Sequence, residues 1–466
     1  MNASARRLLT IVLAAGRGTR MKSARAKVLH PIAGRSMLGH VLSTVATAGE
    51  GRIAVVVGPG AEAVMTETRR WAAAAEVFVQ SEQLGTAHAV LAARPALASH
   101  DGDVIVVFAD TPLLRPQTID RLRAALDGGA AIAVLGFEAA DPTGYGRLLL
   151  GPDGRLEAIR EDKELGEDQR AIALCNAGIM AFRVPRLVAL LDAIGNENGK
   201  GEYYLTDAIA GARTNGLACA VVVCSESEVL GINSRDQLAA AEAIWQARRR
   251  QEVMLAGATL IAPETVWLAF DTQLGRDVVV EPNVFFGPGV VVEDGVVIRA
   301  NSHIDGGGAG EAGVRIRSGA IVGPFARLRP GADIGADVHI GNFVEVKNAR
   351  LEQGAKANHL AYIGDGRVGA GANIGAGTIF CNYDGFFKHF TDVGNGAFIG
   401  SNSALVAPVK IGDGAFVGSG SVITKDVAAD ALAVERSTQE ERPGWAAKFR
   451  AMMSRRKGER KAPDQA

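Results

Sequence analysis

Residues 393–423 read VGNGAFIGSNSALVAPVKIGDGAFVGSGSVI, and an aliphatic side chain returns there at every sixth position. The same spacing occurs in two earlier stretches of the chain. The three series are Val280, Phe286, Val292, Ile298 and Ile304; Val322, Leu328, Ile334, Ile340 and Val346; and Val393, Ile399, Leu405, Ile411, Val417 and Ile423. A helix repeats at 3.6 residues and a strand at 2, so neither produces a period of six. The period is typical of a parallel β-helix, in which each hexapeptide is one short strand with a turn and stacked coils bury the aliphatic side chains.

The composition is that of a folded protein with more than one domain. The chain has 466 residues, which is too long for one hydrophobic core, and 48% of them are hydrophobic. The net charge of −1 does not favour nucleic acid or an anionic membrane as a partner. The four cysteines show no metal-ligand spacing, and reduced thiols in a cytoplasm are the interpretation that we favour. The apolar run 8–15 is too short to span a membrane and has no secretory cleavage site.

The first half of the chain alternates apolar runs with Ala/Leu-rich segments. Runs 8–13, 53–57 and 104–108 are expected to be buried strands, with helices at 61–75 and 87–98 between them. This alternation predicts a doubly wound, Rossmann-like α/β sheet, whose ligands bind beyond the carboxyl ends of the strands. The first run ends in the Gly-rich turn 14–21, which suits a phosphate group. Asp110 follows another run, where it could hold a divalent cation or cap the next helix; the spacing does not decide between these roles.

Several motifs of this sequence resemble those of a known enzyme family. The turn 13–21, Lys27-Val28-Leu29, Gln83-Leu84-Gly85-Thr86, Ala109-Asp110 and Gly144-Tyr145-Gly146-Arg147 resemble the sugar-1-phosphate nucleotidylyltransferases. The segments 201–204 (GEYY) and 231–233 (GIN), with the hexapeptides behind them, narrow the resemblance. Residues 8–445 look like the bacterial family of bifunctional N-acetylglucosamine-1-phosphate uridylyltransferases / glucosamine-1-phosphate N-acetyltransferases. That family makes UDP-N-acetylglucosamine, a precursor of peptidoglycan and lipopolysaccharide, in the cytoplasm.

The resemblance implies a role for each motif of the first half. Residues that would hold the uracil and ribose of UTP are Leu13, Ala14, Gly16, Gln80, Gly85 and Thr86. Arg17 and Lys27 would hold the triphosphate, and Asp110 with Asn233 would ligate Mg²⁺. The N-acetyl sugar would be held by Gly146, Glu161 and Asn176, with Tyr203 as a further candidate. This sequence departs from the family pattern at two places, where Arg25-Ala26 stands before Lys27 and Ala109 stands before Asp110. Both departures could alter the geometry of the loops that carry Lys27 and Asp110.

Residues 234–255 contain strong helix formers without a breaker and predict a helix that joins the two domains. The run Arg248-Arg249-Arg250 is expected to form a solvated face of this helix.

The second half carries polar residues at the expected corners of the β-helix. Arg329 and Lys347 are three hexapeptides apart, near one full coil, so they could stack and bind a phosphate; a solvated basic ladder is the alternative. Segment 381–392 interrupts the register, and insertions in repeat proteins often build the binding site. A lone His359 is usually structural, but transfer of an acyl group to an amine needs a base with a pKa near neutrality.

The resemblance assigns the acetyltransferase roles on a left-handed β-helix. His359 would be the base, with Glu345 as its orienting partner. The sugar-phosphate contacts would be Arg329, Lys347, Tyr362, Asn373 and Lys388. The acetyl-CoA contacts would be Ala376, Asn382, Tyr383, Ser401, Ser419 and Arg436. The family's acetyltransfer site lies between neighbouring β-helices, which implies a homotrimer.

We therefore predict a uridylyltransferase domain at 1–233, a linker helix at 234–255, an acetyltransferase β-helix at 256–436 and a tail at 437–466. The substrates would be UTP, acetyl-CoA and the two sugar phosphates. A monofunctional nucleotidylyltransferase with a structural β-helix is the main alternative, and a non-catalytic platform is a third. A scaffold would not need the set His359, Asn382, Tyr383 and Lys388, and a platform would not need Lys27, Asp110 and Asn233.

Overall fold

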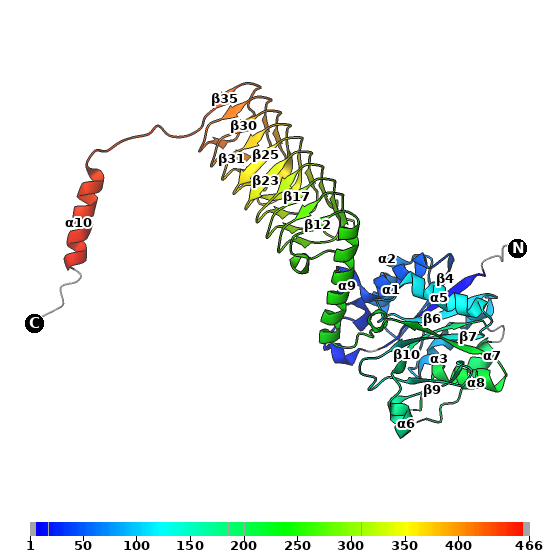
Figure 1. Cartoon of the computed structure of the whole chain (residues 1–466). Coiled ribbons are helices and arrows are strands. Elements are labelled where there is room, and N and C mark those ends of the chain that lie inside the picture. The colour runs from blue at the N-terminus through cyan, green and yellow to red at the C-terminus, as the bar shows by residue number, and fades with distance from the viewer. Residues whose placement is uncertain (1–5, 17, 184–186, 199–200, 309, 460–466) are drawn as a thin grey trace, which may run out of the picture. The chain divides into compact units, whose positions relative to one another are not determined.

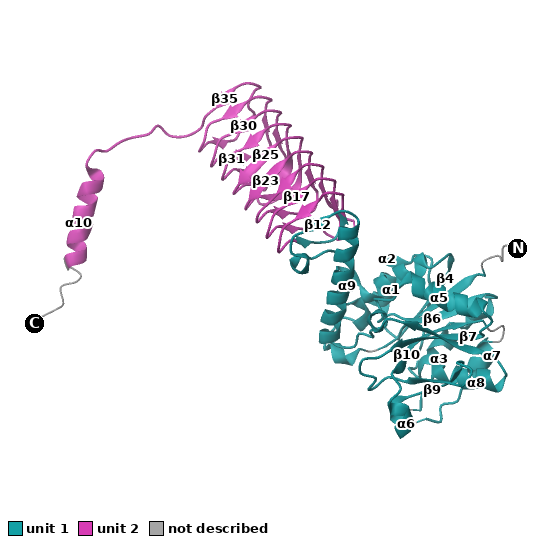
Figure 2. Cartoon of the chain, in the orientation of Figure 1, with its two compact units in different colours: residues 1–273, 285–288 teal, residues 274–284, 289–466 magenta. Residues whose placement is uncertain are grey.

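The computed structural model describes residues 6–16, 18–183, 187–198, 201–308 and 310–459. Two compact units divide the chain: residues 1–273 with 285–288, and residues 274–284 with 289–466 (Figure 2).

The first unit is built on a mixed sheet with helices on both faces (Figure 1). The strand order is β11 (Cys219–Cys224), β7 (Ile132–Glu138), β10 (Leu174–Phe182), β6 (Asp103–Phe108), β1 (Leu8–Ala14), β4 (Gly51–Val57) and β5 (Glu76–Val79). Strands β6, β1, β4 and β5 are parallel, whereas β10 runs antiparallel to β6 and β7. The predicted doubly wound architecture is confirmed. The short strands β8 (Arg147–Leu150) and β9 (Leu156–Arg160) extend the sheet from β10, and the apolar runs predicted neither these strands nor the reversed direction of β10.

Short elements surround this sheet. The remaining strands of the unit are β2 (Pro31–Ile32), β3 (Arg35–Ser36), β12 (Thr259–Leu260) and β15 (Phe285–Phe286), and β13 (Gln273–Leu274) lies at its boundary. The helices are α1 (Met37–Thr47), α2 (Glu62–Trp71), α3 (Thr86–Ala92), α4 (Arg94–Ala98), α5 (Pro116–Asp127), α6 (Glu167–Arg170), α7 (Leu187–Asp192), α8 (Ala208–Thr214) and α9 (Arg235–Leu255).

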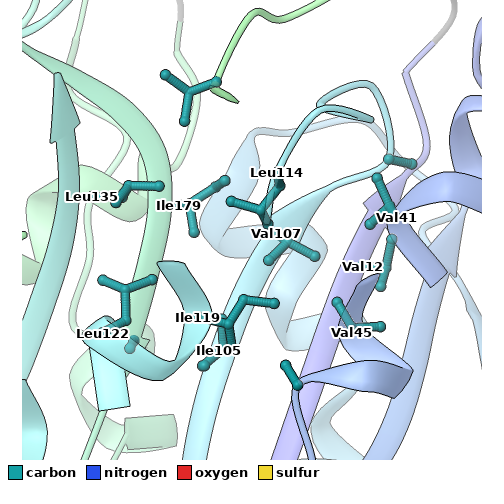
Figure 3. Packing of buried hydrophobic residues seen from close by; sticks show 14 of the residues in the cluster. Val12, Val41, Val45, Ile105, Val107, Leu114, Ile119, Leu122, Leu135 and Ile179 are labelled. Carbon is teal, nitrogen blue, oxygen red and sulfur yellow. The ribbon is translucent and has the colours of Figure 1, made fainter. Parts of the chain in front are cut away.

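Alternation along β1 explains why both faces of the sheet are covered. Leu8, Val12 and Ala14 pack into one hydrophobic cluster with α1 and α5, as Figure 3 shows around Val12, while Leu9, Ile11 and Leu13 pack into the cluster on the other face. A strand buried on both faces reads as a continuous apolar run, which is what residues 8–13 show. Each fully buried large side chain stabilises the fold by about 1.5–3 kcal/mol. This rigid sheet fixes the positions of the loops at its carboxyl edge.

The second unit is a left-handed β-helix with three faces (Figure 1). The hexapeptides predicted the parallel β-helix, and the resemblance implied its hand. Face 1 contains β14 (Val279–Val280), β17 (Val297–Ile298), β20 (Ile321–Val322), β23 (His339–Asn342), β25 (Lys356–His359), β27 (Asn373–Ile374), β30 (Phe398–Ile399), β33 (Phe416–Val417) and β35 (Leu432–Ala433). Face 2 contains β18 (His303–Ile304), β21 (Arg327–Leu328), β28 (Ile379–Cys381), β31 (Ala404–Val406) and β34 (Val422–Ile423). Face 3 contains β16 (Val290–Val292), β19 (Val314–Ile316), β22 (Ala332–Ile334), β29 (Thr391–Val393) and β32 (Val409–Ile411).

Strands β24 (Glu345–Leu351) and β26 (Tyr362–Val368) turn the corner between faces 2 and 3 and pair on both. Each coil visits faces 1, 2 and 3 in that order. The length of the coils varies: 18 residues separate Leu328 from its partner Val346, whereas 17 separate Val346 from Ile363 and Tyr362 from Ile379. Helix α10 (Trp445–Glu459) follows, and its residues from 445 to 458 are exposed.

Candidate functional sites

A cavity of about 250 Å³ opens where β1 and β6 end in the first unit. Its lining includes all the residues predicted to hold uracil and ribose, together with Lys27 and Asp110. The lining residues are Leu13, Ala14, Ala15, Gly16, Lys27, Val28, Gln80, Gln83, Gly85, Thr86, Ala89, Phe108, Asp110 and Glu202. The structure therefore brings the predicted nucleotide-binding residues together at the carboxyl edge of the sheet, where such folds bind ligands. Arg17 lies outside the described residues.

One wall of this cavity is a close backbone contact. Gly85 has φ +113°, and a Cβ there would lie 2.5 Å from the carbonyl oxygen of Tyr203, so only glycine fits. The Tyr203 backbone pairs with both sides of this turn, because its N–H donates to Leu84 and its carbonyl accepts from Ala87. The amide of Gln80 donates to the Gly85 carbonyl at 3.1 Å. The turn is thus held in one shape before any ligand binds.

Lys27 lies at the centre of the polar groups in the cavity. Its side chain is only 8% exposed, and its Nζ donates to the Asp110 carboxylate and, at 2.9 Å, to the Asn233 amide oxygen. Gly18 packs against the same side chain, because a Cβ at Gly18 would lie 2.5 Å from the Lys27 Cβ. An ammonium held in this way presents a fixed positive charge to the phosphate end of the cavity.

The two predicted metal ligands meet because the chain returns to the sheet edge after β11. The Ile232 N–H donates to the Asp110 carbonyl at 3.0 Å, which places Asn233 beside Asp110. A carboxylate and an amide oxygen are hard donors that suit Mg²⁺, and both lie within hydrogen-bonding reach of one cation, the Lys27 ammonium. Among the described residues, no cluster of three or more His, Cys, Asp or Glu side chains has metal-binding geometry. A metal at this site would therefore depend on substrate oxygens for its remaining ligands.

The residues predicted to hold the sugar form a neighbouring group. The Asn176 N–H donates to the Gly146 carbonyl at 2.8 Å, and a Cβ at Gly146 would lie 3.6 Å from the Glu161 carboxylate. The Asn176 side chain accepts from the Gly178 N–H at 2.9 Å, which fixes its orientation. All three predicted residues therefore lie together on the β8–β10 side of the unit.

The second unit contains a cavity of about 680 Å³ at the corner between faces 2 and 3. Arg329 and Lys347 both line it, one coil apart, as their spacing predicted. Lys388 reaches the same cavity from the 381–392 segment. The pKa of the Lys347 ammonium is lowered, first by its contact with Lys388, then by partial burial and by Arg329. Positive charge gathered at one point is relieved when a phosphate binds there.

Tyr362 and Asn382 lie next to this cavity. Asn382 is 7% exposed, and its amide donates to the Asp365 carboxylate and, at 3.4 Å, to the Tyr362 hydroxyl. The structure therefore groups Asn382 with the predicted sugar-phosphate contacts rather than with the other predicted acetyl-CoA contacts. Tyr383 is 61% exposed, and its hydroxyl donates to the Gly385 carbonyl.

Within this chain the structure does not bring Glu345, the predicted orienting partner, to His359. The Glu345 carboxylate pairs with Arg329 at 2.7 Å and with Arg327 at 3.3 Å. His359 instead places its Nδ1 2.7 Å from the Asn342 Oδ1. The physical reason is register: β23 pairs Asn342 with His359, whereas β24 pairs Glu345 with Tyr362.

His359 begins a column of predicted contacts along the corner between faces 1 and 2. The register of face 1 stacks positions 359, 376, 401 and 419 in successive coils. The column holds His359, Ala376, Ser401 and Ser419, and Arg436 caps it by donating to the Ser419 carbonyl at 2.8 Å. Coils are about 4.8 Å apart, so the column is about 14 Å long from His359 to Ser419. Asn373 lies on face 1 between Lys356 and Phe398.

The predicted acetyltransferase residues thus fall into two groups on different corners of one β-helix. The phosphate corner is the group Arg329, Lys347, Tyr362, Asn382 and Lys388. The histidine corner is the column from His359 to Arg436. The sequence predicted no role for Asn342 and Asp365 here, or for Gln83 and Glu202, although the last two stand in motifs that carry the resemblance. A strict period of 18 residues leads from His359 to Gly341, and only the shorter coil brings Asn342 beside it.

Comparisons with known proteins agree with both units. The MobA-like NTP transferase domain matches residues 10–176, and the bacterial transferase hexapeptide matches residues 271–306, 313–348 and 390–425. A protein of Azorhizobium caulinodans named Bifunctional protein GlmU is 59% identical over 448 residues, 96% of this chain and 98% of the relative. Proteins of the same name from Xanthobacter autotrophicus and Agrobacterium fabrum are 58% and 52% identical, over 98% and 95% of this chain and 100% and 96% of their own lengths.

The chain belongs to the GlmU family of bifunctional proteins. As a GlmU family member it is an enzyme with uridylyltransferase and acetyltransferase activities, as the motifs predicted. The alternative of a monofunctional enzyme with a structural β-helix is not supported. No helix in the described part of the chain has the length and apolar character needed to cross a bilayer.

Proposed function

We propose that the first unit joins UTP to N-acetylglucosamine 1-phosphate and releases pyrophosphate. The residues that line its cavity would enclose the uracil and ribose, and Gly146, Glu161 and Asn176 would hold the sugar. A sugar phosphate is already an anionic nucleophile, so the reaction needs no general base. It needs alignment of two anions and neutralisation of their charge. Lys27, buried and held by two side chains, supplies that charge, together with Arg17 by resemblance.

Mg²⁺ fits this proposal because Asp110 and Asn233 offer it two oxygen ligands. The ion would neutralise phosphate charge in the transition state. In the structure the Lys27 ammonium donates to both of these side chains, so they would hold the ion beside the lysine that neutralises the phosphates.

We propose that the second unit acetylates glucosamine 1-phosphate with acetyl-CoA. The amide oxygen of Asn342 only accepts hydrogen bonds, so it holds the proton on Nδ1 of His359 and leaves Nε2 free as a base. Nε2 takes the proton that the amine loses as its nitrogen attacks the acetyl carbonyl carbon. The carbon–sulfur bond breaks, the acetamide forms, and the CoA thiolate receives the proton.

The phosphate corner and the histidine corner support a site shared between chains. Lys347 pairs with Gly364, whereas His359 ends β25 on face 1, and the chain turns at Leu360 between them. The two side chains therefore belong to different corners of the coil. A base must come within about 3.2 Å of the proton that it removes. We propose that neighbouring copies each supply one of the two corners to a site.

Exposed apolar side chains beside His359 point to that second copy. Phe325, Phe343 and Leu360 occupy successive coils of the histidine corner and are 49%, 57% and 58% exposed. The rings of Phe325 and Phe343 stack with centroids 5.4 Å apart, and all three residues have positive φ. Non-glycine residues rarely adopt this conformation, and a partner surface would compensate for its cost. We propose a homotrimer in which this corner faces a neighbouring β-helix.

A pair of variants tests the two activities. Asp110→Asn is expected to abolish uridylyl transfer and leave acetyl transfer intact, and His359→Gln is expected to do the reverse. Both substitutions keep the size of the side chain, and circular dichroism with a thermal melt checks the fold of each protein. Loss of both activities in either folded variant would contradict the assignment of one site to each unit.

The cysteines support the predicted cytoplasmic location. Cys175, Cys219, Cys224 and Cys381 are free thiols, and the first three are buried. Burial raises the pKa of Cys219 to about 11 and that of Cys224 to about 12, so these thiols resist oxidation. We propose a cytoplasmic enzyme that supplies UDP-N-acetylglucosamine for cell-envelope synthesis.

A further inference from the structure

The first unit has another cavity, of about 640 Å³, that uridylyl transfer does not use. It lies between α1, the loop 112–117 and the middle of α9, and its lining includes His40, Arg115, Trp245, Arg248 and Arg249. None of these residues lines the cavity that holds Lys27. This cavity is therefore separate from the uridylyl site.

Arginines of α9 that were expected to face solvent build this cavity instead. Arg248 donates to the Leu113 carbonyl at 2.9 Å and to the Ser227 carbonyl at 3.1 Å. Arg249 donates to the Thr272 carbonyl at 2.8 Å. Its Nε is buried and has no hydrogen-bond acceptor among the described residues. The prediction of a solvated basic face is wrong, because backbone carbonyls bind these guanidinium groups. The carbonyls are neutral, so the positive charge of the arginines remains uncompensated by them.

Positive charge in the cavity exceeds negative charge. Arg115, Arg248 and Arg249 are opposed by the carboxylate of Glu252 alone in the lining, and Arg249 pairs with it at 3.0 Å. Burial lowers the pKa of Arg248, and the charge of Arg115 lowers it further. His40 adds no charge at neutral pH, because burial lowers its pKa to about 4. Two guanidinium groups that repel each other beside a cavity are a typical feature of an anion site.

The start of α5 adds to this field. Arg115 is the N-cap residue of α5, no acidic residue lies in the first turn, and no side chain caps it. The N-terminus of a 12-residue helix carries a partial positive charge that favours an anion. The Arg115 side chain is 52% exposed, and the nearest carboxylate, Glu228, is 3.9 Å from its Nε. Arg115 can therefore turn to a ligand without breaking a close contact.

We propose that this cavity is a second anion site, which binds the phosphoryl group of a small metabolite and is coupled to uridylyl transfer. The cavity wall at Pro112 to Leu114 follows Asp110 directly, and α9 begins two residues after Asn233. A ligand that contacts both elements orders the two side chains that serve the uridylyl site. This coupling, unlike the binding itself, rests on the function proposed for the first unit.

Calorimetric titration of the full-length protein tests the binding. The probe is ADP, which offers a diphosphate to the arginines and a flat ring to Trp245. The titrations are made in a Lys27→Ala, Lys347→Ala background, which removes a phosphate contact from each catalytic site. Arg115→Ala is expected to weaken ADP binding about tenfold, the loss of one charge-assisted contact. Arg69→Ala on α2 removes the same charge from an exposed position and is expected to leave binding unchanged.

Inorganic phosphate is the second probe. Binding of phosphate that depends on Arg115 identifies a simple phosphoryl site, and binding of ADP alone identifies a nucleotide site; either result supports the proposal. Absence of binding in the Lys27→Ala, Lys347→Ala background, or equal affinity with and without Arg115→Ala, overturns it.

Kinetics test the coupling separately. At saturating UTP, ADP is expected to lower the KM for N-acetylglucosamine 1-phosphate about fivefold in wild type and not in Arg115→Ala. An unchanged KM in the presence of bound ADP overturns the coupling. Because calorimetry needs no turnover, failure of the proposed uridylyl function would leave the binding result intact.

Discussion

Two inactive variants are expected to restore acetyl transfer to each other when they assemble together. His359→Ala removes the base and keeps the phosphate corner, whereas Lys347→Ala removes a phosphate contact and keeps the base. If each site takes one corner from each of two neighbouring chains, a site is complete when a Lys347→Ala chain supplies the histidine corner and a His359→Ala chain supplies the phosphate corner. Random assembly from equal amounts places these two chains in that order at about one quarter of the interfaces of a cyclic trimer.

The assay is the rate of CoA release from acetyl-CoA with glucosamine 1-phosphate as acceptor. Co-expressed chains with different affinity tags are purified on both tags in turn, so that every assembly contains both variants. Selecting mixed trimers raises the expected rate to about one third of wild type, because every such trimer has one complete interface out of three. The two variants purified separately and mixed without subunit exchange serve as the control. A rate near zero in the doubly purified assemblies would refute the shared site and place both corners in one chain's own site.

Three further predictions concern the β-helix. Asn342→Ala removes the acceptor that keeps the proton on Nδ1 of His359, so it is expected to lower kcat for acetyl transfer about tenfold or more and to change the pH–rate profile. An unchanged profile would show that Asn342 does not position His359. The pKa of Lys347 lies below the ordinary lysine value of 10.5, and the ammonium loses its proton as the pH rises through that pKa. The affinity for glucosamine 1-phosphate is therefore expected to fall over that pH range in binding assays. Lys347→Arg should remove this pH dependence, and a dependence that persists in the variant would contradict the prediction. Gly341→Ala, whose Cβ would lie 1.9 Å from the Asn358 carbonyl oxygen, is expected to cost the β-helix about 2–3 kcal/mol in a denaturant titration and to spare uridylyl transfer; stability equal to wild type would contradict the packing argument.

The fold of each unit could be predicted from the pattern of apolar residues in its sequence. Every sixth position is aliphatic in the β-helix, and Ile298, Val322 and Ile340 are each at most 1% exposed in the structure. The continuous apolar run 8–13 became β1, buried on both faces. In both cases burial alone dictates the residue type, so the pattern is visible without any knowledge of long-range contacts.

The arrangement of side chains at the acetyltransfer site could not be predicted in the same way. A coil of 17 residues instead of 18 places Asn342, and not Gly341, beside His359. Hexapeptide counting does not reveal which corner of the coil loses the residue. The guanidinium groups of Arg248 to Arg250 bind backbone carbonyls of distant segments, such as Leu113, and no local pattern predicts that. Periodicity predicts what is buried, whereas polar contacts depend on register and on chain returns.

The measurement that tests the central claim most directly is CoA release from acetyl-CoA with glucosamine 1-phosphate as acceptor, in wild type and in His359→Ala. Two active centres in one chain predict release that requires the amino sugar and disappears in the variant, while uridylyl transfer continues at the wild-type rate. No release from a folded wild-type protein that still forms UDP-N-acetylglucosamine would contradict the claim and leave the β-helix as a scaffold.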